Sequence, residues 1–273
     1  MDLVKIIQAI SKVEGVKAIA LGGSQSRNEA SETSDYDIGV YYTTDNLDIL
    51  GLEAVLKVLD DEHRDNLLNV PGEWGPWING GGWLTVDGVA VDILLRDIKR
   101  VENVINDCIE GKIIIDYQCG HPFGFVNSIY AAETHYCKIL WQDKTKQLER
   151  LKAILYFKGE YSPLLKEGVI KKFLWEAWFS LACAHKAAVK GDVNYVIGSV
   201  FRTVCSWIQV IYAVNNRYLM NEKGTLSIVK NLEIKPNDME KRVKKIYISI
   251  SEGRAEEAYE MLEDLHKEVE ALA

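Results

Sequence analysis

The chain has 273 residues, 48% of them hydrophobic, and a formal net charge of −8. This length allows two folded domains with sizeable cores. Residues 1–144 hold 12 Lys and Arg against 23 Asp and Glu, a net charge of −11, whereas the remainder holds 20 against 17, a net charge of +3. An acidic first half argues against a general nucleic-acid-binding protein, which needs a basic surface. It suits a carboxylate site for cations, although two ordinary solvated surfaces would give the same balance.

The first half alternates helical and strand patterns. Apolar spacing predicts helices over residues 3–13, 47–59 and 97–110. Runs of β-branched and aromatic residues predict strands over residues 16–21, 36–43, 83–86, 89–95 and 113–117. Asp87-Gly88 separates two of these runs, a dipeptide that favours a tight β-hairpin.

From about Phe125 onward the pattern is mostly helical, with helices predicted over residues 171–190, 199–215 and 255–271. We therefore predict an α+β protein. A domain over residues 1–143, with a mixed sheet and flanking helices, precedes an all-α helical bundle over residues 144–273.

Cysteine usage and hydropathy indicate the compartment. The five cysteines have no CxxC spacing, and the N-terminal segment is amphipathic rather than secretory, so we expect reduced thiols in a cytoplasmic protein. The longest apolar stretch, residues 200–214, contains Arg202 and is too short to span a bilayer. We expect it to be a buried helix, and we expect no membrane partner.

Three features in chain order point to a phosphate and metal site. Gly22-Gly23-Ser24 ends an apolar strand and turns into a helix, where backbone N–H groups and a hydroxyl face an anion. Asp35 and Asp37 lie two residues apart at the next strand and point the same way. Asp92 lies between Val91 and Ile93, where a carboxylate is costly unless it is paired or metal-bound.

Together these residues predict a two-metal centre. Closely spaced carboxylates repel one another, and Mg²⁺ relieves that repulsion while also binding phosphate oxygens. One ion would activate an attacking hydroxyl and the other would hold a triphosphate. Each motif alone is more often a plain turn, a surface pair or a helix cap. Their order and spacing favour the functional interpretation.

The sequence from Leu21-Gly22-Gly23-Ser24 through Ser34-Asp35-Tyr36-Asp37 to Asp92 resembles the polymerase-beta-like nucleotidyltransferase superfamily. The motif resemblance covers roughly residues 18–97. A helical bundle behind such a domain is similar to the aminoglycoside and lincosamide nucleotidyltransferases. The resemblance implies that residues 1–143 form the catalytic domain and that the bundle over residues 144–273 binds the acceptor and closes over the NTP. The resemblance implies two Mg²⁺ ions and an NTP, for which ATP is expected. It also implies that Gly22, Gly23 and Ser24 bind the nucleotide and that the three aspartates are both metal ligands and catalytic residues.

Several further residues have two interpretations each. Arg27 is a candidate phosphate contact or an exposed helix residue. Glu73 is a candidate general base, a role that the resemblance suggests, or a surface-loop residue. Lys223 is a candidate γ-phosphate contact or part of a helix end at Gly224.

Aromatic and imidazole groups are likewise open to two interpretations. Trp74, Trp77 and Trp83 are a candidate wall for a base or an acceptor, although packing is expected for at least two of them. His121, in Gly120-His121-Pro122, is expected to open a helix and to cap it or pack, rather than to bind phosphate.

The sequence therefore predicts an enzyme that moves a nucleoside monophosphate from an NTP to a hydroxyl of a small molecule, with an antibiotic among the implied acceptors. One alternative is a protein-adenylylating enzyme of the toxin–antitoxin type. Another is a degenerate nucleotide-binding module. The three intact aspartates argue against the module, because binding alone does not need the third carboxylate.

Overall fold

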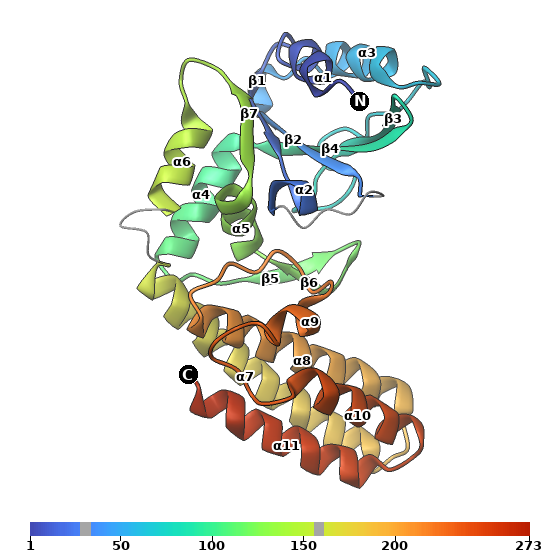
Figure 1. Cartoon of the computed structure of the whole chain (residues 1–273), viewed down its shortest axis with the longest axis vertical. Helices are drawn as coiled ribbons and strands as arrows, with labels where there is room; N and C mark the ends of the chain where they lie inside the picture. The colour runs from blue at the N-terminus through green and yellow to red at the C-terminus, as the bar shows by residue number, and fades with distance from the viewer. Residues whose placement is uncertain (28–33, 156–160) are drawn as a thin grey trace. The chain divides into compact units, whose positions relative to one another are not determined.

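The computed structural model of the chain describes residues 1–27, 34–155 and 161–273. The chain forms two compact units. One consists of residues 1–106 and 116–159, and the other of residues 107–115 and 160–273. Helices and strands alternate in the first unit, whereas the second unit is built from helices (Figure 1). The α+β fold class is confirmed. A domain boundary between residues 143 and 144 stays a prediction, since these units divide the chain at other residues.

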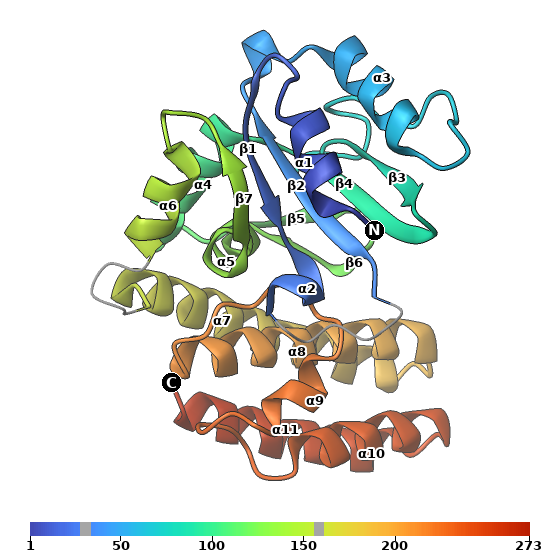
Figure 2. The same cartoon turned by 45° about the horizontal axis from the view of Figure 1, so that its top comes forward.

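The first unit contains a mixed five-stranded sheet with the strand order β3-β4-β2-β1-β7 (Figure 2). Only the central pair, β2 and β4, is parallel; the other neighbouring strands pair antiparallel. The strands are β1 (Val16–Leu21), β2 (Tyr36–Tyr42), β3 (Gly81–Val86), β4 (Val89–Asp97) and β7 (Lys138–Gln142).

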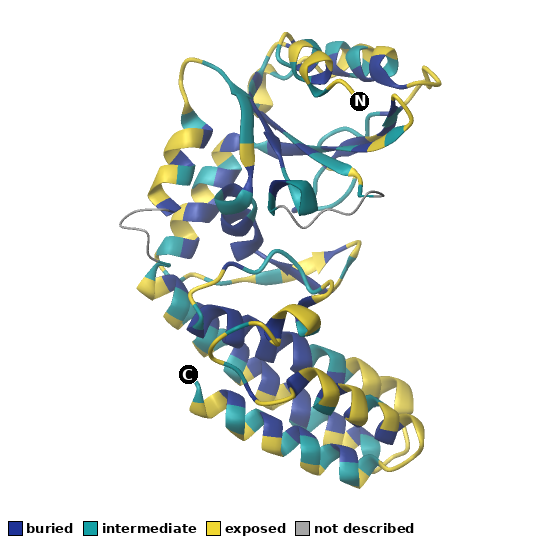
Figure 3. Ribbon diagram, in the orientation of Figure 1, coloured by how far each residue is buried: buried dark blue, intermediate teal, exposed yellow. Residues whose placement is uncertain are grey.

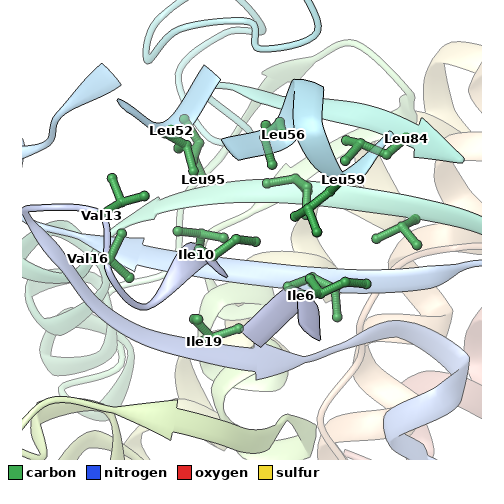
Figure 4. Close-up of a cluster of buried hydrophobic side chains, with 14 of the residues drawn as sticks. Ile6, Ile10, Val13, Val16, Ile19, Leu52, Leu56, Leu59, Leu84 and Leu95 are labelled. Carbon is green, nitrogen blue, oxygen red and sulfur yellow. The ribbon is translucent and has the colours of Figure 1, made fainter. Parts of the chain in front are cut away.

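Two helices, α1 (Leu3–Ile10) and α3 (Ile49–Leu59), cover one face of this sheet (Figure 4). Each begins at an aspartate whose side chain accepts backbone N–H groups, Asp2 for α1 and Asp48 for α3. Their apolar side chains pack on alternate strand residues in one core cluster. The cluster includes Ile6 and Ile10 of α1, Leu52 and Leu56 of α3, and Ile19, Leu84, Ile93 and Leu95 of the strands. Because strand side chains alternate, the residues between these lie on the opposite face of the sheet.

The predicted β3–β4 hairpin is confirmed. Asp87 and Gly88 connect the two strands and have φ angles of +51° and +74°. Positive φ at both positions is the geometry of a type I′ turn, whose twist matches that of the paired strands. The predicted Val91 and Ile93 pair is buried in the core, and Asp92 between them is half-buried on the other face, as the alternation requires.

Two strand segments were wrongly predicted as helical. His121 and Pro122 begin β6 (His121–Val126), which pairs with β5 (Ile115–Gln118), so His121 does not open a helix. Pro122 is tolerated there because a two-stranded sheet consists of edges. The mostly helical pattern expected from Phe125 is also interrupted by β7, which pairs with β1. Helix α4 (Ile98–Ile109) precedes the β5–β6 pair, and helices α5 (Ser128–Tyr136) and α6 (Gln147–Leu155) follow it.

The second unit is a helical bundle. Its long helices α7 (Pro163–Ala188) and α8 (Val193–Val214) pack side by side, and α10 (Met239–Ser251) and α11 (Ala255–Ala271) pack on them. The short helix α9 (Thr225–Val229) packs against α8 and α10. Gly224 has a φ of +67° and precedes α9. The interpretation of Gly224 as the end of the apolar helix is therefore wrong, since that helix ends at Val214.

Helix α8 begins earlier than predicted. Within the described parts of the chain it is the one helix long and apolar enough to cross a membrane by length and composition, although 72% of its most apolar window is buried inside the protein. All residues from Thr203 to Val214 are buried, and much of the α8 ribbon is dark blue in Figure 3. Core helices share this length and composition. The prediction of a buried helix is confirmed.

Candidate active site

The face of the five-stranded sheet opposite α1 and α3, called the open face, carries a row of candidate functional side chains. Asp37 of β2 lies directly beside Asp92 of β4 in the parallel register. Trp83 of β3 lies directly opposite Asp92 in the antiparallel register. Directly paired residues project from the same face of a sheet. The chain therefore places an indole and two carboxylates side by side across three strands.

The glycine turn closes around Asp37. The Gly22 N–H donates a hydrogen bond to the Asp37 carbonyl oxygen at 2.8 Å. Gly23 begins the short helix α2 (Gly23–Arg27) with a φ of +56°, and a Cβ added there would lie 1.6 Å from Asp37 Oδ2. A side chain at residue 23 would thus displace the carboxylate. Glycine at residue 23 is therefore required for Asp37 to lie against the turn that carries Ser24.

The three aspartates interact as charges. Burial and, after it, the negative charges of Asp35, Asp92 and Glu133 together raise the pKa of Asp37 from 3.8 to about 6, although the positive charge of Arg27 lowers it. Burial also raises the pKa of Asp92, with a second contribution from Asp35. A carboxylate cluster that resists ionisation in this way favours a bound cation.

The donor set fits a hard divalent cation such as Mg²⁺, which prefers carboxylate oxygens. Across residues 1–27, 34–155 and 161–273, no three His, Cys, Asp or Glu side chains form a group that could hold a metal ion as they stand. The assignment of Asp35, Asp37 and Asp92 as metal ligands rests on their mutual repulsion and stays a prediction.

A buried ion pair beneath the site was not predicted from the sequence. Arg96 of β4, which is 2% exposed, donates to both carboxylate oxygens of Glu133 on α5, at 2.9 and 2.8 Å. Burial lowers the pKa of Arg96, but the Glu133 carboxylate more than offsets this and the net shift is upward. The guanidinium also lies 5.5 Å from the ring centre of Tyr130. The pair fixes α5 to the open face of the sheet, beside the aspartates.

We expect replacement of Arg96 by Leu to destabilise the first unit by about 3–5 kcal/mol, because it leaves the Glu133 carboxylate partly buried without its partner. Guanidinium-induced unfolding followed by circular dichroism measures the change. The double variant Arg96→Leu/Glu133→Leu is the control, and it should recover much of the loss. Equal loss in the single and double variants would show that packing, rather than charge pairing, holds α5 in place.

The remaining predicted residues lie in different places. Glu73 is exposed, and its carboxylate accepts the Val70 N–H at 2.8 Å, which closes its own loop. Arg27 lies close enough to Asp37 for its charge to lower the pKa of that carboxyl. Lys223 is an exposed residue of the second unit, where its N–H donates to Asn221 Oδ1 at 2.9 Å. The general-base role of Glu73 and the phosphate role of Lys223 stay predictions.

The three tryptophans differ in burial and in stacking partner. Trp77 is 3% exposed, and its ring stacks on Phe125 with centroids 5.2 Å apart. Trp74 stacks on Trp83 with centroids 4.5 Å apart, and Trp83 remains 57% exposed. Trp77 is therefore a packing residue, and Trp83 presents an indole to solvent.

One family model matches the part of the chain that contains this site. Residues 2–115 match the family model of the nucleotidyltransferase domain. The chain is also similar to the crystal structure of a nucleotidyltransferase-like protein from Exiguobacterium sibiricum 255-15, at 10% identity and a TM-score of 0.45 over 95% of this chain and 71% of that one. None of the curated proteins matches the chain. Residues 2–115, which contain the glycine turn and all three aspartates, thus identify the chain as one that carries a polymerase-beta-like nucleotidyltransferase domain, the kind of domain that transfers a nucleoside monophosphate.

Proposed function

We propose that the protein transfers a nucleoside monophosphate from an NTP, with ATP as the expected donor, to a hydroxyl of a small-molecule acceptor in a Mg²⁺-dependent reaction. The observation that carries the proposal is the cluster of three aspartates next to the glycine turn, where burial and the charges of Asp35 and Asp92 raise the pKa of Asp37 to about 6. A structural carboxylate is normally paired with a cation or hydrogen-bond donors, which lower its pKa. Carboxylates whose pKa is raised instead suit a site that gains further positive charge from a ligand.

Each residue has a defined part in this proposal. Asp35 and Asp37 would hold the ions that bind the triphosphate, and Asp92 would hold the ion next to the acceptor hydroxyl. When bound, Mg²⁺ supplies positive charge to the phosphoryl oxygens and lowers the pKa of the attacking hydroxyl. The turn at Gly22, Gly23 and Ser24 would orient the phosphates through backbone N–H groups and a hydroxyl. Arg27 would add a positive charge on the same side.

The acceptor class and the compartment are also proposals. The net charge of −11 over residues 1–144 supports a small molecule over a nucleic acid, whose phosphates such a surface repels. All five cysteines are free, and Cys108, Cys137 and Cys205 are buried. Reduced thiols are typical of the cytoplasm, where we place the protein.

The proposal is tested by incubation of the full chain with Mg²⁺ and labelled ATP, GTP, CTP or UTP. The acceptor arms are aminoglycosides, lincosamides, a protein-free metabolite extract and whole-cell lysate. We expect label on a small molecule. Label on a protein band would instead support protein adenylylation, and no label in any arm would support a nucleotide-binding module.

We expect Mg²⁺ and NTP together to raise the melting temperature by several degrees, and NTP alone to raise it much less. A ligand that binds the native state stabilises it by about 2.7 kcal/mol at a hundred times its Kd. Without cations, the triphosphate meets the charges of Asp35, Asp37 and Asp92 and is repelled. Thermal unfolding with NTP in excess Mg²⁺ or in excess EDTA makes the comparison. Equal shifts in the two buffers would contradict a cation-dependent site.

A further inference from the structure

We propose that the indole of Trp83, supported by Trp74, is the binding surface for the acceptor, and that it selects acceptors whose hydroxyl is carried by a ring with a flat apolar face. The inference rests on the proposed function, because it needs the transfer site at Asp37 and Asp92. It adds a residue that determines acceptor specificity.

The first step is the position of Trp83 relative to Asp92. The two residues face each other across the β3–β4 ladder, and Asp92 in turn neighbours Asp37. Directly opposite residues of an antiparallel pair have Cβ atoms about 4.5–5.5 Å apart. A molecule that lies against the Trp83 indole therefore lies within reach of the Asp92 carboxylate.

The second step is the direction of the reaction. Phosphoryl transfer places the attacking oxygen and the leaving oxygen roughly in line, on opposite sides of the phosphorus. The glycine turn and Arg27 follow β1, so the triphosphate would lie on the β1 and β2 side of the row. The attacking hydroxyl must then approach from the β4 and β3 side, where Asp92 and Trp83 lie.

The third step is the way the indole is held. The loop before β3 is attached to the β5–β6 hairpin by Gln118, whose Nε2 donates to the Trp74 carbonyl oxygen at 2.6 Å and whose Oε1 accepts the Trp77 N–H at 3.1 Å. Trp74 then stacks on Trp83 at a centroid distance of 4.5 Å. The stacked rings of Trp74 and Trp83 are thus ordered before any ligand binds, which lowers the entropy cost of binding.

The exposure of Trp83 also favours a binding role. A large aromatic side chain contributes to folding stability in proportion to its buried area, yet Trp83 stays 57% exposed while Trp77 nearby is 3% exposed. The half-exposed indole gives a flat apolar face beside carboxylates. Such a face binds planar rings and the C–H faces of saturated rings, whereas an acyclic alcohol gains little from it.

The test compares the wild-type protein with Trp83→Ala, Trp83→Phe and Leu50→Ala. Leu50 is 82% exposed on α3, the helix that covers the opposite face of the sheet, so its replacement is the matched surface control. For each protein two quantities are measured: the Mg²⁺-NTP-dependent melting shift, and the initial transfer rates to the aminoglycoside, lincosamide or extract component that the wild type labels.

We expect Trp83→Ala to raise the acceptor KM by on the order of tenfold, the size of one lost aromatic stacking contact. Its NTP-dependent melting shift and its NTP KM should stay at the wild-type values, and Trp83→Phe should recover most of the acceptor affinity. Leu50→Ala should match the wild type. An unchanged acceptor KM in an active Trp83→Ala variant would overturn this inference alone, as would loss of its NTP-dependent shift. A wild type that labels no small molecule in any arm overturns the proposed function and this inference with it.

Discussion

Replacement of Asp37 or of Asp35 by Asn is expected to reduce kcat for nucleotidyl transfer by about three orders of magnitude or more, because each change removes a ligand of the ions that stabilise charge in the transition state. Asn keeps the shape of the side chain, removes the charge and replaces one carboxylate oxygen by an NH2 group, which is not a metal ligand. The measurement is transfer of label from the NTP to the acceptor under saturating Mg²⁺. Near-wild-type turnover in either variant would refute the two-metal assignment.

The Asp37 variant also has a diagnostic effect on stability. The pKa of Asp37 is about 6 in the folded protein, against an ordinary 3.8, so the folded state binds this proton more tightly than the unfolded state does. The contribution of Asp37 to the free energy of unfolding therefore falls as the pH rises from about 4 to about 6. Asp37→Asn avoids this loss, and we expect the metal-free variant to be more stable than the wild type at pH 7.5 by about 1–2 kcal/mol, with the difference absent below pH 4. Denaturant unfolding at the two pH values measures it.

Replacement of Asp92 by Asn is expected to separate binding from catalysis. Transfer should be lost, because the ion next to the acceptor hydroxyl loses its ligand. The melting shift caused by Mg²⁺ and NTP should remain, because Asp35 and Asp37 still hold the nucleotide. The metal-free protein should be as stable as the wild type or slightly more stable, since burial and Asp35 both raise the pKa of Asp92.

Both quantities are measured on one preparation. A structural Asp92 would behave in the opposite way, because loss of a buried partner costs about 1–3 kcal/mol and leaves catalysis intact. A destabilised but active Asp92→Asn enzyme would therefore show that this carboxylate stabilises the sheet and is not needed for catalysis.

The central elements were predictable because local signals coincide there. Val16–Leu21 is an apolar run ended by glycines, and the strand has those bounds. Asp87-Gly88 fixed the hairpin, and the alternation around Asp92 placed it on the face opposite the core. Both depend on residues close together in the chain, which is the range over which sequence patterns carry information.

The errors arise where partners are distant in sequence. The segment Lys138–Gln142 is short, and it is a strand because β1 offers it a free edge more than a hundred residues earlier. His121-Pro122 suggested a helix start, but pairing with β5 determines the conformation. The ion pair of Arg96 with Glu133 spans 37 residues. Its one sequence signal was an arginine on the same side of β4 as Asp92.

The edge position of β7 has a consequence for synthesis of the protein. The family match ends at residue 115, but the sheet is complete only when Lys138–Gln142 pairs with β1. A nascent chain that has been synthesised only as far as residue 115 contains the three aspartates. It still lacks β7, so the edge of β1 is open, and it lacks Glu133, the partner of Arg96. Open edges pair with other chains. A fragment that stops near residue 115 should therefore aggregate. A fragment that extends past residue 155 retains β7 and α6, and we expect it to fold without the rest of the chain.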